Sequence, residues 1–301
     1  MTSSGGTYGF RTRPVVGEAE LNEIERFRVH LRQIPELMER WQVLSETEPH
    51  PNSDLRLDDR ATEGRHLTGG VHFALNFASD NLRALHQQHS GDTDYPTPFV
   101  ASYPLARAAL EASSLALWVL HPDEREDRIR NHLRNYAREL YEETVLRKFA
   151  LKQASEARDR LKVSGAVLGK SEREFERWKK RHNSRVADHA ARAGIPNPMD
   201  SRRVGYGEIV ADATAAVGLP PSHGELVWME VSGLTHPSLM RAMSTMKIEQ
   251  QSDNDDGTIN VVMTSKTDTI ATAVRASVLN YMTAIDLYGR RIRDPETGRA
   301  H

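Results

Sequence analysis

The stretch FVASYPLARAALEASSLALWVLH, residues 99–121, is apolar around nearly the whole circumference of the helix that it predicts. A helix without a polar face packs among other helices, so this stretch indicates a helical bundle with residues 99–121 at its centre. It is long enough to cross a bilayer, but Arg107 and Glu111 lie in its middle, where charges are costly in lipid. We therefore expect a buried helix of a soluble, cytoplasmic protein with no membrane span.

Amphipathic patterns before and after this stretch predict further helices, and the fold class is mainly α. The expected helices cover residues 18–45, 66–89, 123–162, 171–193, 206–217, 222–235 and 267–288. The helix over 123–162 is dense in both charge signs and carries a heptad-like seam formed by Ile129, Leu133, Tyr136 and Leu140. It predicts one long charged helix that packs along a partner helix.

Three segments depart from the helical pattern. Residues 1–17 are polar and glycine-rich and predict a disordered leader, and residues 290–301 predict a frayed tail. Two β-type runs flank an acidic segment, which predicts a small β-hairpin at residues 246–263. Residues 18–289 are expected to form a single helical domain, with a candidate sub-boundary near 194–204 at a glycine and two prolines.

Composition excludes several classes of protein. The formal net charge is −2 and there is no cysteine. A nearly neutral chain has no overall attraction to nucleic acid or acidic membranes, and a chain without cysteine has no disulfides, thiolate nucleophiles or cysteine-ligated metals. The sequence also lacks a P-loop, a dinucleotide-binding glycine fingerprint and a Gly-x-Ser-x-Gly elbow. The commonest NTPases, dehydrogenases and hydrolases are therefore disfavoured, and no cofactor is expected.

Arg107 and Glu111 are the first candidate site. They are four residues apart and share one face of the apolar helix. Charges in so apolar a helix need partners, because each costs several kcal/mol to desolvate. The pair either lines a polar pocket for an anion, a nucleotide or water, or forms a structural ion pair that fixes helix packing. The sequence leaves both interpretations open.

A second candidate is the segment SGLTHPS, residues 232–238, followed by Arg241. His236 lies there among hydroxyl side chains and two residues that break regular structure, and it could act as an acid or base near neutral pH. Alternatively Thr235 or Ser238 caps a short helix. If both candidates form one site, its ligand-binding residues are Arg107, Glu111, Ser232, His236 and Arg241.

Metal and nucleic-acid signals are weaker. The spacing of His66, His72, His86 and His89 matches no metal motif, and the acidic segment 253–257 fails the EF-hand template, so no metal site is expected. Basic residues surround Trp178 in the segment 173–185, a pattern that can bind single-stranded nucleic acid. Acidic residues dilute that pattern, so it is also typical of a solvated helix face.

The segments YPLARAALEA (103–112) and SGLTHPS (232–238) resemble a group of uncharacterised bacterial helical proteins related to the HEPN-like superfamily. That superfamily includes ribonucleases of toxin–antitoxin and phage-defence systems. The resemblance implies an all-helical bundle that is often a homodimer, and it raises RNA cleavage as an activity.

The catalytic signature of the superfamily is an Arg followed by a His after four to six residues, usually with a polar residue directly after the Arg. Five pairs meet this spacing: Arg60/His66, Arg65/His72, Arg83/His89, Arg125/His132 and Arg177/His182. Among them Arg125 and His132 are chosen, because Glu126 follows the Arg and the pair lies on the long charged helix.

Two functions follow from these observations. The favoured one is a non-catalytic helical binding or assembly protein, homodimeric or bound to a protein partner, and related to defence if the resemblance holds. The alternative is a HEPN-type, metal-independent ribonuclease, with Arg125, His132 and His236 as candidate catalytic residues and RNA as the partner. The sequence leaves open whether the chain is an enzyme.

Overall fold

The computed structural model describes residues 18–89, 100–157, 165–255, 259–264 and 267–298. The leader expected at residues 1–17 lies outside this range. The described chain is mainly helical, as the sequence predicted. Among the described residues no helix is both long and apolar enough to cross a membrane.

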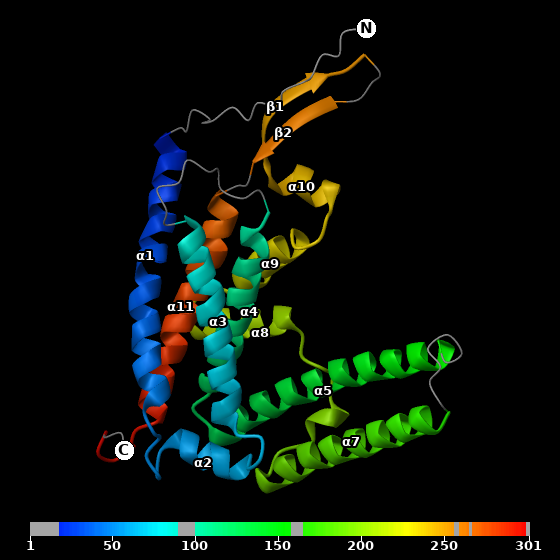
Figure 1. Cartoon of the computed structure of the whole chain (residues 1–301). Helices are drawn as coiled ribbons and strands as arrows, with labels where there is room; N and C mark the ends of the chain where they lie inside the picture. The colour runs from blue at the N-terminus through cyan, green and yellow to red at the C-terminus, as the bar shows by residue number, and fades with distance from the viewer. Residues whose placement is uncertain (1–17, 90–99, 158–164, 256–258, 265–266, 299–301) are drawn as a thin grey trace.

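Four helices run side by side and form the body of the protein (Figure 1). They are α1 (Glu18–Glu46), α3 (Leu67–His89), α4 (Ser102–Leu120) and α11 (Thr267–Arg291). Thirteen of the 19 residues of α4 are buried, which confirms that it is the central helix. The short helix α2 (Asp54–Ala61) closes one end of the bundle, and α1 continues through Pro35 as one helix.

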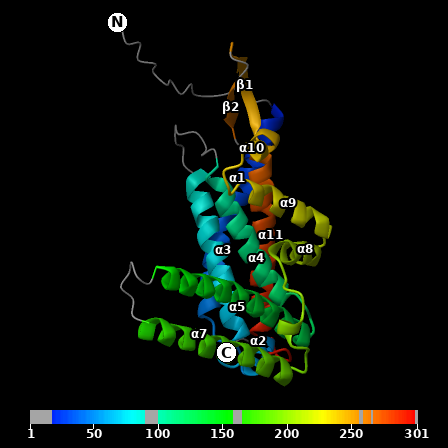
Figure 2. The same cartoon turned by 90° about the vertical axis from the view of Figure 1, so that its right-hand side faces the viewer.

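Two further helices form an arm that leaves the body near α2 (Figures 1 and 2). They are α5 (Arg125–Glu156) and α7 (Gly165–Arg192). The seam predicted on α5 is buried, and Phe175 and Val186 of α7 are buried as well. The sequence predicted that this helix begins at Ser171, but α7 begins at Gly165 and includes Gly169. Ser171 therefore lies inside the helix, and its hydroxyl donates to the carbonyl of Val167. The arm is thus a helical hairpin attached to the body at one end.

A second, smaller helical hairpin packs against α4. It consists of α8 (Tyr206–Ala216) and α9 (Pro221–Gly233), which meet closely at Gly224. A Cβ atom at Gly224 would lie 1.9 Å from Oγ1 of Thr214, so only glycine allows this approach. Beyond it follow α10 (Leu239–Thr245) and strand β1 (Lys247–Asp253), which pairs antiparallel with β2 (Ile259–Thr264).

A buried arginine ties the end of α4 to α2. Arg128, 2% exposed, donates from Nε and Nη2 to the two carboxylate oxygens of Asp58, at 2.7 and 3.1 Å. Its Nη1 donates to the carbonyls of Pro122 and Asp123 at 3.2 and 2.6 Å. Burial raises the pKa of Asp58, and the Arg128 guanidinium opposes that rise. The two charges compensate each other, so the pair holds the junction of α2, α4 and α5.

The chain near residue 290 is more ordered than the sequence indicated. Arg291 belongs to α11 and donates to the carbonyls of Leu120 and Pro122, at 2.9 Å each, and to Asp54 at 2.6 Å. Ile292 is 1% exposed. The sequence predicted a frayed tail from residue 290, but the chain is held in place through residue 292. Arg291 is fixed there because its guanidinium bonds the free carbonyl groups at the end of α4.

Candidate binding site

The two segments that the sequence singled out meet where α9 crosses α4. Arg107 donates from Nε to Oε1 of Glu111 at 2.8 Å, so the pair four residues apart does form. Trp228 donates its indole N–H to the same oxygen at 2.7 Å. Arg107 also donates from Nη1 to the hydroxyl of Thr235 at 3.1 Å. We call Arg107, Glu111, Trp228 and Thr235 the α4–α9 junction.

The other predicted site residues lie around this junction. The Thr235 hydroxyl donates to the carbonyl of Ser232 at 2.7 Å, whereas the Ser232 hydroxyl is buried without a hydrogen-bond partner among the described residues. The Arg241 side chain packs over Gly233, with its Nε 3.1 Å from where a Cβ would lie. His236 is exposed beside them. The two segments therefore do come together, around a partly exposed ion pair.

Ser238 behaves as the capping interpretation predicted. Its hydroxyl accepts a hydrogen bond from the backbone N–H of Arg241 at 3.3 Å, and α10 begins at the next residue. This bond satisfies one of the free N–H groups at the start of a helix.

The junction has limited capacity for an external ligand. The side chain of Arg107 is 30% exposed and that of Glu111 is 16% exposed, and each is already bonded across the α4–α9 contact. Close by, Tyr206 accepts a hydrogen bond from Arg138 at 3.1 Å. Burial raises the pKa of Tyr206, and the Arg138 charge opposes that rise. The geometry favours a role of the ion pair in helix packing.

Arg125 and His132, the pair that best matched the ribonuclease signature, each contact a backbone carbonyl, but Arg125 is exposed and His132 is buried. Arg125 donates to the carbonyl of Leu57 at 2.7 Å. A ring nitrogen of His132, Nε2, lies 2.9 Å from the carbonyl oxygen of Arg65. Burial lowers the pKa of His132 to about 4, and the residue is 5% exposed. A neutral, enclosed imidazole holds α5 against the start of α3 and has no direct access to solvent.

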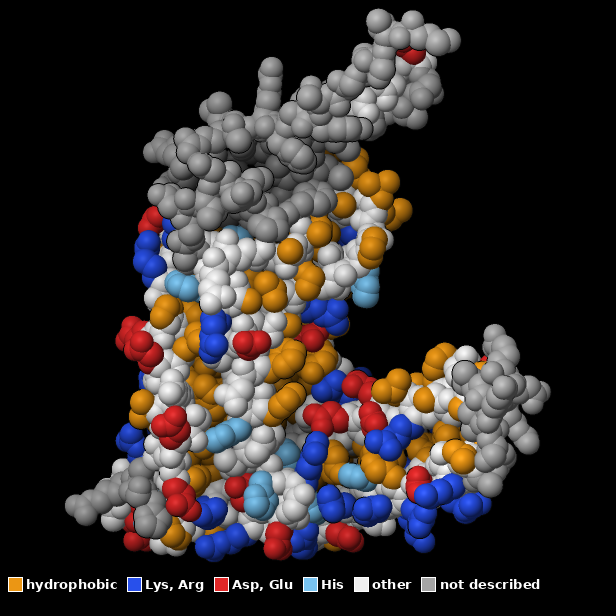
Figure 3. All heavy atoms as spheres, viewed as in Figure 1, with side chains coloured by type: hydrophobic (Ala, Val, Ile, Leu, Met, Phe, Trp, Pro, Cys, Tyr) orange, Lys and Arg blue, Asp and Glu red, His pale blue; other side chains and the backbone are white. Residues whose placement is uncertain are grey.

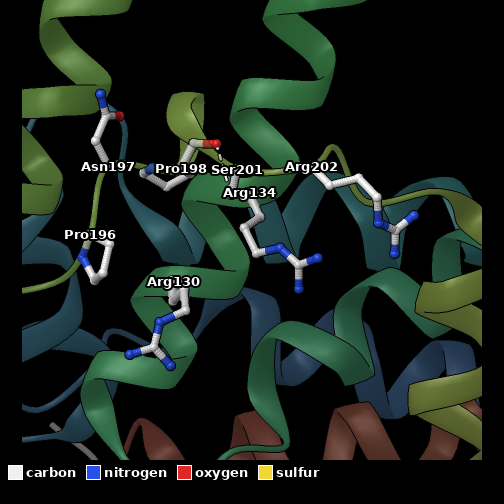
Figure 4. Close-up of a pocket in the computed structure, with 7 residues that line it drawn as sticks. All are labelled: Arg130, Arg134, Pro196, Asn197, Pro198, Ser201 and Arg202. Carbon is white, nitrogen blue, oxygen red and sulfur yellow. Dashed lines mark hydrogen bonds between the residues drawn. The ribbon is translucent and has the colours of Figure 1, made fainter.

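A pocket that the sequence did not reveal lies at the base of the arm. It has a volume of about 320 Å³ and is bounded by α5 and by the segment that follows α7 (Figure 4). Gly194 ends α7 with a φ of +68°, a conformation that favours glycine, and Pro196 and Pro198 then direct the chain along α5. The lining side chains belong to Arg130, Arg134, Pro196, Asn197, Pro198, Ser201 and Arg202. We call it the arm-base pocket.

The arm-base pocket carries a surplus of positive charge. Arg134 and Arg202 both donate to Glu208, at 2.7 and 2.5 Å, and each bonds a different oxygen of that carboxylate. Arg130 pairs with Asp127. Arg134 and Arg202 thus share one carboxylate, which leaves one positive charge uncompensated beside Glu208. From the sequence, only the shared helix face of Arg130 and Arg134 and the nearby glycine–proline boundary could have signalled this pocket.

Large apolar side chains are exposed at several places, among them Phe73 and Phe77 on α3, and they are most numerous in two regions. On the outer half of α5 they are Tyr141, Val145, Leu146 and Phe149; around α9 and α10 they are Leu226, Met229, Leu239 and Met240. Figure 3 shows hydrophobic side chains along the arm and near α10 on this face of the molecule. Clustered exposed apolar residues are typical of interaction surfaces.

No family model matches the chain, and no curated protein or solved structure matches it. Within the described residues, no group of three or more His, Asp or Glu side chains is arranged to hold a metal ion. The candidate sites are therefore interpreted from their own geometry.

Proposed function

We propose that this chain is a non-catalytic assembly protein that forms a homodimer through the outer half of α5. The observation that carries the proposal is the exposure of four large apolar side chains in this one helix: Tyr141 at 44%, Val145 at 47%, Leu146 at 62% and Phe149 at 60%. Apolar surface at this density is costly in water and is stabilised when a second surface covers it.

The face concerned is exposed, and Arg203 covers it only at Tyr141 among the described residues. Tyr141, Val145 and Phe149 follow one another at spacings of four, so they lie along one side of α5. The opposite side, which includes Tyr136 and Leu140, is buried at the contact with α7. Among the described residues, the contact on the outer face is made by the Arg203 guanidinium, 3.4 Å from the centroid of the Tyr141 ring. A second helix therefore has room to pack beside Val145 and Phe149.

The order of charges along α5 favours a second copy as the occupant. On the Val145 side of α5, Glu142 precedes Val145 and Lys148 follows it. Glu143 and Arg147 pair with each other on the other side, where Arg147 lies over Trp178 of α7. A two-fold axis near Val145 would pack two α5 helices antiparallel and bring Glu142 of each copy beside Lys148 of the other. Such an isologous contact is the commonest interface of homodimers, and pairs of opposite charge fix its direction.

The test is the oligomeric state by sedimentation velocity. The wild-type chain is expected to be a dimer, and Val145→Glu a folded monomer, because the two-fold contact would bury two uncompensated carboxylates. Leu226→Glu is the matched control, since Leu226 is 55% exposed on α9, outside the proposed interface. Lys148→Glu is expected to weaken the dimer and Lys180→Glu, on α7, to leave it unchanged. A monomeric wild-type protein, or equal effects of Val145→Glu and Leu226→Glu, would contradict the proposal.

A second candidate function is the HEPN-type ribonuclease, and one observation favours it. The outer side of α7 exposes Arg173, Arg177, Lys180 and Arg181, and within the described residues none of these forms an ion pair. Figure 3 shows Lys and Arg side chains gathered along this edge of the arm. Unpaired cations along a helix are suited to an RNA backbone.

For this candidate, expression of the wild-type chain is expected to slow bacterial growth, and His236→Ala to restore it. His236 is exposed, so its replacement leaves the fold intact. Equal growth of cells that express either chain would remove the ribonuclease from consideration.

A further inference from the structure

The geometry points to the arm-base pocket as a binding site for a small phosphomonoester, a molecule with one phosphate group on a compact body such as a sugar. The inference does not depend on the proposed dimer, because the pocket is formed within one chain. It rests on three features of the pocket: its arginines, the way one carboxylate holds two of them, and its shape.

The arginines offer the donors that a phosphate needs. Each guanidinium presents several N–H groups in a planar fork that matches phosphate oxygens, which makes arginine well suited to phosphate recognition. In Figure 4 the guanidinium groups of Arg134, from α5, and Arg202, from the segment after α7, lie on the same side, whereas that of Arg130 is directed to the other side. The surplus positive charge of the pocket favours a dianion over a neutral ligand.

Glu208 positions two of these donors next to each other. Its Oε1 accepts from Nη2 of Arg134, and its Oε2 accepts from Nη2 of Arg202. Arg134 also lies over the ring of Trp118, with Cζ 5.6 Å from the ring centroid, so its orientation is set from two sides. Arg202 is 80% exposed and is free to turn toward a ligand. Glu208 therefore holds the site in place and also competes with an incoming anion for the same N–H groups.

The shape of the pocket indicates a ligand larger than phosphate itself. Its volume of about 320 Å³ lies at the lower end of the range of about 300–1,000 Å³ for small-molecule pockets. Pro196 and Pro198 form part of its wall and contribute apolar surface without N–H donors. A compact body such as a pentose can contact the prolines while its phosphate bonds the arginines.

The experiment measures binding to the full chain by isothermal titration calorimetry, with ribose 5-phosphate, inorganic phosphate and ribose as separate ligands. Ribose 5-phosphate is expected to bind most tightly, inorganic phosphate more weakly, and ribose not detectably. Failure of both phosphate-bearing probes to bind would overturn the inference. Tighter binding of inorganic phosphate than of ribose 5-phosphate would overturn the assignment of a phosphomonoester.

Three variants test which groups are responsible. Arg202→Gln is expected to weaken binding of ribose 5-phosphate about tenfold, because it removes a charge-assisted hydrogen bond to the phosphate. Arg203→Gln is the matched control, because Arg203 is exposed and does not line the pocket. This variant should bind ribose 5-phosphate with the affinity of the wild-type chain. Glu208→Gln is expected to tighten binding, because it removes the competing charge. Equal weakening by Arg202→Gln and Arg203→Gln, or weaker binding by Glu208→Gln, would overturn the assignment.

The monomeric variant Val145→Glu separates this site from the proposed dimer. It is expected to bind ribose 5-phosphate as the wild-type chain does. Loss of binding in folded Val145→Glu protein would show that one chain does not form the complete site, and would overturn the inference as stated.

Discussion

Arg107 on α4 donates a hydrogen bond of 3.1 Å to the hydroxyl of Thr235, which follows α9 and is 128 residues away in the sequence. The same guanidinium bonds Glu111, whose Oε1 also accepts from Trp228. One ion pair thus joins the central helix to the smaller helical hairpin. The contact is specific, since it uses both a charge and the fixed geometry of the donors.

The first prediction concerns this ion pair. Arg107→Ala is expected to lower the free energy of unfolding by about 1–3 kcal/mol, because it leaves the largely buried Glu111 carboxylate without its cation. Urea denaturation followed by circular dichroism measures the change. Arg32→Ala, which removes an exposed ion pair with Glu25, is the control and should change stability by less than about 1 kcal/mol. A fully stable Arg107→Ala protein would contradict a packing role for the pair.

The second prediction concerns the contact of α8 with α9. Gly224→Ala is expected to destabilise the fold by about 1–3 kcal/mol, because the new methyl group would overlap the Thr214 side chain. Adding Thr214→Gly should recover part of the loss by removing the atoms that clash. Gly205→Ala is the control, since nothing lies within 4 Å of a Cβ there. The midpoint of thermal unfolding is measured for the wild-type chain and the three variants. If Gly224→Ala did not lower the stability, α8 and α9 could move apart without cost.

The third prediction concerns the buried ion pair of Arg128 and Asp58. Asp58→Asn is expected to cost about 3–5 kcal/mol, because it leaves the Arg128 guanidinium buried without a carboxylate. Asp54→Asn is a suitable comparison, because its side chain is 41% exposed and the loss should be smaller. If unfolding in urea showed equal losses for the two variants, the burial of Asp58 would not be what makes the pair important.

The fourth prediction is a dependence of stability on pH. Burial lowers the pKa of His132 in the folded protein to about 4, from the ordinary histidine value of 6.5. Between these values the unfolded chain binds the proton and the folded chain does not, so the free energy of unfolding falls as the pH is lowered from 6.5 toward 4. One such group contributes a slope of up to about 1.4 kcal/mol per pH unit.

His132→Gln tests that assignment, because glutamine retains a hydrogen-bonding group without titrating. Relative to the wild-type chain, His132→Gln is expected to reduce the slope by roughly one bound proton. Denaturant unfolding at a series of pH values between 4 and 7 measures the slope of both proteins. A slope unaffected by His132→Gln would contradict the assignment and point to other histidines whose pKa burial lowers, such as the half-buried His89.

Much of the fold could be predicted from the sequence because it depends on local rules. The apolar circumference of residues 102–120 leads to burial on every side, and Gly194 with two prolines ends α7 where the sequence indicated. The candidate site could be predicted only in part. The spacing of Arg107 and Glu111 predicted their contact, but nothing near Ser232 specified that this segment would meet Arg107.

By itself, then, the sequence determined the mainly helical class, the central helix and the pairing of charges four residues apart, because each follows from the period of the α-helix. Only the tertiary structure decided that the outer half of α5 remains exposed beyond Leu140, since that depends on how far α7 and the body cover it. The same packing enclosed His132 and brought Arg202 beside Arg134. These arrangements arise from contacts between segments far apart in the chain, and the angles at which helices leave the bundle are set by packing rather than by any local pattern.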